Sequence, residues 1–107
     1  MGVVAGILGL LYAALHGVGA PRRSADAIPD WARTLWLVFV AITAVASVIV
    51  VFDASVLAVL LLAVGVLGIA ALAVANGVWL HGRPHWQHHL VRLAFAALVL
   101  VPAVLAL

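Results

Sequence analysis

Four of the five histidines lie close together in the segment HGRPHWQHH, residues 81–89. Neutral imidazole is the commonest protein ligand for zinc, copper, nickel and iron, so this cluster is compatible with a metal site. His85 lies three residues before His88 and four before His89, so either pair would hold one ion. His81 or His16 would be the third donor, whereas a closed structural site needs four ligands and the chain has neither cysteine nor glutamate. The candidate metal ligands are His81, His85 and His89, with a metal ion or a haem left open as the cofactor.

An anion site is the better physical fit to the same segment. The first turn of a helix presents unpaired backbone N–H groups and the positive end of the helix dipole, which together favour phosphate or carboxylate. Arg83 precedes that turn and Arg92 lies within the expected helix, where an ionisable residue is a functional-site hypothesis by default. Basic pockets on the cytoplasmic side of membrane proteins bind lipid headgroups, so the expected ligand is an anion or a lipid headgroup. The expected anion- or lipid-binding residues are Arg22, Arg23, Arg83, His85, His88, His89 and Arg92.

Further polar and aromatic residues are spaced to reach the same end of the protein. His16 and Tyr12 share a helical face, and Asn76 lies at one end of an apolar face in the third apolar stretch. Trp79 lies one turn beyond Asn76, and Trp86 lies at the start of the fourth stretch. Tryptophan also anchors helices at the level of lipid headgroups, which is the alternative interpretation of the two indoles. We expect Tyr12, His16, Asn76, Trp79 and Trp86 to support the site.

Two resemblances to known families are limited to a short segment and to size. The segment HWQHH, residues 85–89, resembles the HxxHH box of membrane fatty-acid desaturases and hydroxylases, which would imply a di-iron site. Those enzymes combine three histidine boxes, whereas this chain has one overlapping cluster. The length and the expected four spans are similar to those of the small multidrug-resistance transporters, which carry an essential glutamate in their first helix. This chain has no glutamate, and neither family is assigned.

Membrane helices must position these residues, because the composition excludes a soluble domain. Of 107 residues, 69% are hydrophobic and 7% are charged, whereas about a quarter of a typical soluble domain is charged. Four apolar stretches meet, two of them narrowly, the requirement of roughly 20 residues for crossing a hydrocarbon core about 30 Å thick, and an open sheet edge has no partner in lipid. We expect an all-α integral membrane protein, with four transmembrane helices in one compact antiparallel bundle over residues 1–107. The expected helices are 2–18, 31–52, 54–80 and 84–107, and the loops on one side are 19–30 and 81–83.

Single residues indicate how these helices begin and how their polar side chains are satisfied. Asp30 is expected to cap the second helix and Asp53 the third, because a carboxylate accepts hydrogen bonds from the first free backbone N–H groups. Thr43 and Ser47 lie one turn apart at mid-depth of the second helix. We expect both hydroxyls to bond backbone carbonyls of their own helix.

The arginines predict the orientation in the membrane. All five lie in the loops 19–30 and 81–83 or in the adjoining helix ends, and Asp53 is the only charged side chain expected at the opposite end. By the positive-inside rule both loops are cytoplasmic and both termini are outside. We therefore expect a multi-pass protein of the plasma membrane with its binding chemistry at the cytoplasmic interface.

The sequence leaves several functions open. We favour binding or transport of an anion or lipid headgroup, and the alternatives are an accessory or structural membrane subunit and a metal- or haem-binding protein. An enzyme is disfavoured because the chain has no paired carboxylates and no nucleophile with an oriented base. Expected partners are membrane lipids and either further copies of the chain or a partner subunit, with no nucleic acid. Close contact faces for such a partner are Gly2 with Gly6, and the surface formed by Gly65, Gly68, Ala71 and Ala75.

Overall fold

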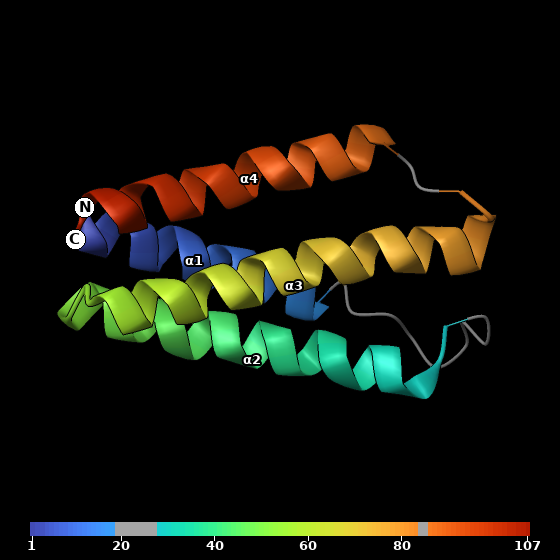
Figure 1. Cartoon of the computed structure of the whole chain (residues 1–107), viewed down its shortest axis with the longest axis horizontal. Coiled ribbons are helices and arrows are strands. Elements are labelled where there is room, and N and C mark those ends of the chain that lie inside the picture. The colour runs from blue at the N-terminus through green and yellow to red at the C-terminus, as the bar shows by residue number, and fades with distance from the viewer. Residues whose placement is uncertain (19–27, 84–85) are drawn as a thin grey trace.

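Four α-helices make up the described structure. The computed structural model describes residues 1–18, 28–83 and 86–107, and these residues contain no strand. The expectation of an all-helical chain is confirmed. The helices are α1 (Gly2–Val18), α2 (Asp30–Phe52), α3 (Val56–His81) and α4 (Trp86–Leu105) (Figure 1).

Successive helices run antiparallel to one another along the long axis of the molecule, which measures 40 Å (Figure 1). α1 packs against α2 and α4, and α3 packs against the same two helices. Both chain termini lie at one end together with the α2–α3 connection, which contains Asp53. We call this the terminal end, and we call the opposite end, where α3 ends and α4 begins, the arginine end.

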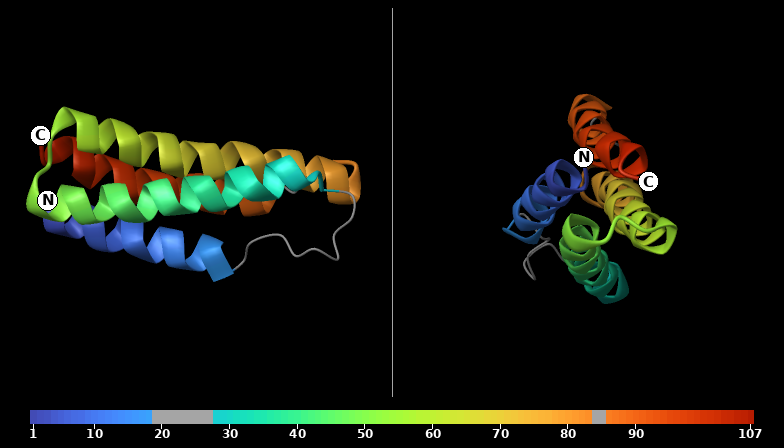
Figure 2. Two further views of the ribbon diagram at one scale, coloured as in Figure 1. Left: turned by 90° about the horizontal axis from the view of Figure 1, so that it is seen from below. Right: turned by 90° about the vertical axis from the view of Figure 1, so that its left-hand side faces the viewer.

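α1 is too short to reach the arginine end beside its neighbours. It has 17 residues against 26 in α3, and at about 1.5 Å per residue this makes α3 longer by roughly 13 Å. Figure 2 shows α1 ending well before α2 and α3 do. The last turn of α1 therefore lies within the length of the bundle, where its final carbonyl groups have no further turn of helix to bond.

Three of the helices are long and apolar enough to span a membrane. These are α2, α3 over residues 56–79, and α4, while α1 is shorter. Leucine, valine and isoleucine side chains make up most of the outward-facing surface of the bundle. A soluble monomer does not expose an apolar surface of that extent, so these helices are suited to lipid.

Glycines allow α2 to lie close to both α1 and α3. A Cβ atom at Gly65 of α3 would lie 2.9 Å from the backbone nitrogen of Thr43 and 3.1 Å from the carbonyl oxygen of Phe39. On α1, Gly6 faces the Ser47 carbonyl and Gly9 faces the Ser47 side chain in the same way. The glycine faces expected to serve a partner helix are thus used within the chain.

The helix starts differ from two sequence expectations. α3 begins at Val56 rather than at residue 54, because the Ser55 hydroxyl accepts a hydrogen bond from the backbone N–H of Ala58 at 3.2 Å. Asp53 instead ends α2 in an extended conformation, and its N–H donates to the Ile49 carbonyl at 2.7 Å. The prediction that Asp53 caps α3 was wrong.

Asp30 does not cap α2 either. It lies inside the first turn of that helix, and Pro29 occupies the capping position without a side-chain hydrogen bond. The Asp30 carboxylate accepts from the guanidinium of Arg33 at 2.9 Å, one turn along the helix. The carboxylate is therefore engaged by a side chain instead of the free backbone N–H groups.

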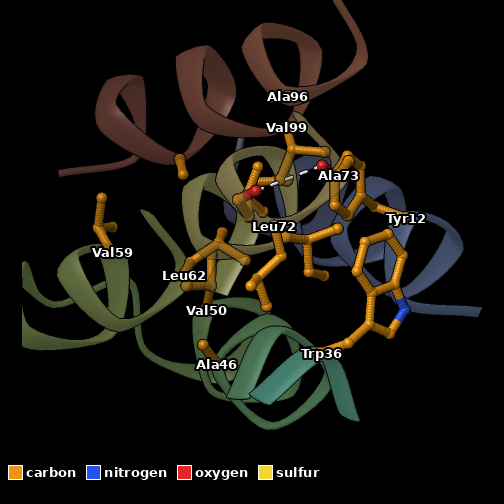
Figure 3. Packing of buried hydrophobic residues seen from close by; sticks show 14 of the residues in the cluster. Tyr12, Trp36, Ala46, Val50, Val59, Leu62, Leu72, Ala73, Ala96 and Val99 are labelled. Carbon is orange, nitrogen blue, oxygen red and sulfur yellow. Dashed lines mark hydrogen bonds between the residues drawn. The ribbon is translucent and has the colours of Figure 1, made fainter. Parts of the chain in front are cut away.

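The core is filled by one face of each helix (Figure 3). α3 contributes Leu62, Val66 and Ile69, all fully buried. Thr43 and Ser47 are also fully buried, and their hydroxyls donate to the carbonyls of Phe39 and Thr43 at 2.8 and 2.6 Å. The expectation that these hydroxyls are satisfied within their own helix is confirmed.

Candidate functional site

Arg92 lies between two histidines on neighbouring helices. Its Nε donates to Nε2 of His16 in α1 at 3.1 Å, and its Nη1 donates to Nδ1 of His89 in α4 at 3.1 Å. His89 is buried and the other two side chains are half-buried. The arginine that the sequence placed inside a span is thus fixed by residues from two helices.

The hydrogen bonds determine where the protons of His16 lie. Arginine has only donors, so Nε2 of His16 must be the acceptor. The other ring nitrogen, Nδ1, lies 2.7 Å from the Tyr12 carbonyl oxygen, which accepts only, so Nδ1 carries the proton. His16 in this arrangement is neutral, and it adds no charge to that of Arg92.

The end of α1 connects the site to the other helices. The indole Nε1 of Trp36 in α2 donates to the His16 carbonyl at 2.9 Å, which satisfies one of the free carbonyls at the end of α1. The Tyr12 hydroxyl donates to the Val66 carbonyl of α3 at 3.3 Å. Tyr12 also stacks on the His16 ring, with centroids 4.1 Å apart. In Figure 3 the rings of Tyr12 and Trp36 lie side by side at the edge of the core.

No carboxylate balances the charge of Arg92 within the described residues. The chain has three acidic residues. Asp30 is bonded to Arg33, Asp53 lies at the terminal end, and Asp26 lies outside the described residues. The C-terminal end of α1 carries a partial negative charge, and this end supplies His16 to the guanidinium. The hydrogen bonds of Arg92 to other described residues are those to the two histidines.

A pocket of about 270 Å³ between α3 and α4 reaches this arginine. α4 contributes the polar part of its wall through His89 and Arg92, and α3 contributes only apolar side chains. The two helices diverge toward the arginine end (Figure 1). The complete lining consists of Leu67, Ala70, Ala71, Val74, Trp86, His89, Arg92 and Leu93.

Other expected site residues in the described part of the chain are arranged differently. Arg83 and His88 are exposed, and Trp86 is exposed but contacts the His89 ring at a centroid distance of 6.0 Å. Asn76 is buried as expected, yet its Oδ1 has no hydrogen-bond partner among the described residues and does not bond Arg92. Trp79 packs edge-on against Trp31, at 5.6 Å between ring centroids.

The remaining expectations fall outside the described residues. Arg22, Arg23 and His85 belong to this group, as does the side chain of His81. The proposed metal set of His81, His85 and His89 is consequently untested. Within the described ranges no three histidine or aspartate side chains are grouped as metal ligands.

Sequence reasoning missed two components of the site. Trp36 was not among the expected site residues, although it is buried and bonds α1. Its place on one face with Ala32 and Thr43, both buried, was the available signal. The α3 wall of the pocket was also missed, because alanines and leucines carry no chemical signature.

Comparisons with known proteins find no matching family model, no matching curated protein and no matching solved structure. The function is therefore inferred from the residues of the site.

Proposed function

We propose that this protein is a four-span membrane protein that binds a phosphate-type anion at the arginine end of its bundle. α1 crosses the membrane with the other three helices in this proposal, since its 17 residues extend about 25 Å and its outward-facing side chains are apolar. The arginine end faces the cytoplasm because it carries the arginines.

The observation that carries this proposal is the environment of Arg92. An arginine that only anchored its helix would extend its head toward water. This guanidinium instead bonds His16 and His89 between two helices, and no described carboxylate neutralises it. Charged groups in such places are paired, so a bound anion is the missing partner.

The chemistry of the site favours binding over catalysis. The guanidinium of Arg92 offers hydrogen-bond donors and a positive charge, which suit the oxygens of a phosphate group. The two sources of such a group are inorganic phosphate and the headgroup of an anionic phospholipid.

Calorimetric titration of the full chain in a neutral detergent tests this proposal. The probes are inorganic phosphate and short-chain phosphatidylglycerol, which distinguish the two sources. We expect at least one to bind, and Arg92→Ala to weaken binding about 10- to 100-fold, the loss of a charged hydrogen bond. Arg92→Lys should restore part of the affinity, because lysine keeps the positive charge but lacks the planar guanidinium group that can donate two parallel hydrogen bonds.

Arg33→Ala is the matched control. It removes another arginine near the same end, but one already engaged by Asp30, and it should leave the affinity unchanged. Asp26→Asn is a second control, because Asp26 is the one acidic residue outside the described part of the chain, and it should also leave the affinity unchanged. Failure of both probes to bind, or equal binding by wild type and Arg92→Ala, would overturn the proposal.

A further inference from the structure

We infer that the ligand of the Arg92 site is an anionic phospholipid that enters sideways from the bilayer, with its phosphate at Arg92 and part of an acyl chain between α3 and α4. This inference rests on the proposed anion site and adds the class of ligand and its route.

The pocket surface is almost entirely apolar, and its ionisable lining residues, His89 and Arg92, lie on one side of it. His89 and Arg92 lie on α4, while the opposite wall on α3 is formed by leucine, valine and alanine side chains. A free anion held there would lose water along α3 without gaining a hydrogen bond, which is costly. A molecule with hydrocarbon inside the pocket and a phosphate at its Arg92 edge matches this lining.

The shape of the pocket fits a chain rather than a helix. The α3 wall runs from Leu67 to Val74, which is about 10 Å along the helix axis. Ala70 and Ala71 have small side chains that leave space along this wall, and the volume of the pocket is about 270 Å³. A helix from a second copy is itself about 10 Å wide with its side chains, so it would not fit into this space, whereas one segment of an acyl chain would.

The pocket opens toward the lipid-facing surface. Leu67 and Leu93, which line it from opposite helices, are each about half exposed. Trp86 lies at the start of α4 and is 64% exposed, as expected for an indole at the headgroup level. A phospholipid of the same leaflet would therefore reach Arg92 without leaving the bilayer.

Native mass spectrometry of the full chain tests this inference, with long-chain phosphatidylglycerol added to the detergent-solubilised protein. The wild type should retain one phosphatidylglycerol per chain. Ala71→Leu places a larger side chain on the α3 wall of the pocket and should reduce the lipid-bound fraction at least tenfold. Ala41→Leu places the same side chain on the exposed surface of α2 and should leave it unchanged.

The outcomes separate this inference from the proposed function. Loss of lipid in Arg92→Ala but not in Ala71→Leu would overturn the inference and leave the anion site intact. No loss in either variant would overturn both. A lipid-free dimer would identify a second copy as the occupant, and tighter binding of inorganic phosphate would identify a free anion; either result would overturn the inference.

Fluorescence quenching provides a second readout that does not depend on the Ala71 variant. Phosphatidylglycerol brominated on its acyl chains should quench tryptophan emission more strongly in wild type than in Trp86→Phe, because Trp86 lines the pocket. Equal quenching of the two proteins would contradict the placement of the acyl chain.

Discussion

Arg92 carries a full positive charge, and both of its described hydrogen bonds go to neutral imidazole nitrogens. This arrangement fixes the direction of the guanidinium without neutralising it. A carboxylate in place of either histidine would complete an ion pair and leave no reason to bind an external anion. Histidine at both positions therefore holds the guanidinium in place and adds no negative charge beside it.

Trp36→Phe tests how strongly the end of α1 is held. The variant removes the indole donor from the His16 carbonyl and should lower the free energy of unfolding by about 0.5 to 1.5 kcal/mol, the usual net value of a hydrogen bond. Denaturation in mixed detergent micelles, followed by circular dichroism, measures this change. Trp31→Phe is the control, since Trp31 is exposed in the same helix. An equal effect of the two variants would argue against a specific role for the Trp36 bond.

Spacing predicted the faces that carry the site but not all of the contacts made there. His16 and Tyr12 share a face of α1, and Arg92 lies on a face of small residues in α4, as expected. The contact between His16 and Arg92 depends on α1 lying beside α4, which is a result of packing. Helical periodicity determines the buried face of one helix and leaves the choice of neighbour open.

At the scale of the helices, the length of α1 determines the depth of the site. Because α1 ends before its neighbours (Figure 2), its last turn meets α4 at Arg92, inside the span. The negative end of the α1 dipole then lies beside the guanidinium. This places the His16 ring, in the last turn of α1, within hydrogen-bonding distance of Arg92.

Gly65→Ala tests the close approach of α2 and α3. The new methyl group would press on backbone atoms of Thr43 and Phe39, which cannot rotate away, so we expect a loss of about 1 to 3 kcal/mol in unfolding free energy, as for other overpacked cores. Gly17→Ala is the control, because its methyl group would meet only Val40, at an ordinary distance of 3.5 Å. Thermal unfolding in detergent compares the two, and equal melting temperatures would contradict the described α2–α3 contact.

The sequence predicted the existence of the helices better than their ends. Long apolar stretches allow few alternatives in lipid, and all four helices were anticipated. Asp53 and Ser55 are both good capping residues in the same short connection, and the structure uses Ser55. Which of them caps α3 depends on the backbone path through residues 53–55, and composition does not specify that path.

For the whole molecule, charge differs sharply between the two ends. Asp53 lies at the terminal end, and Arg33 and Arg83 lie at the arginine end. With the arginine end in the cytoplasm, an alkaline phosphatase fused after Leu107 should be active and a green fluorescent protein fused there should be dark. The same reporters inserted after Gly82 should give the opposite pattern. A fluorescent fusion at Leu107 would contradict the proposed orientation.

The site and the lipid route require the same orientation. An arginine end in the cytoplasm places Arg92 in the inner leaflet, where anionic phospholipids are concentrated in many cell membranes. The opening between α3 and α4 then faces its ligand directly. Binding at this site would add lipid contacts to both helices and stabilise the end where they diverge.

The most direct test of the central claim is a solid-state NMR measurement of dipolar coupling between arginine guanidinium ¹⁵N and lipid ³¹P, with the protein in phosphatidylglycerol bilayers. The Arg92 signal is identified by its absence in Arg92→Lys, and the Arg33 signal serves as the internal control because Asp30 engages that side chain. The account predicts stronger dephasing by phosphorus at Arg92 than at Arg33. Dephasing at Arg92 no greater than at Arg33 would contradict it.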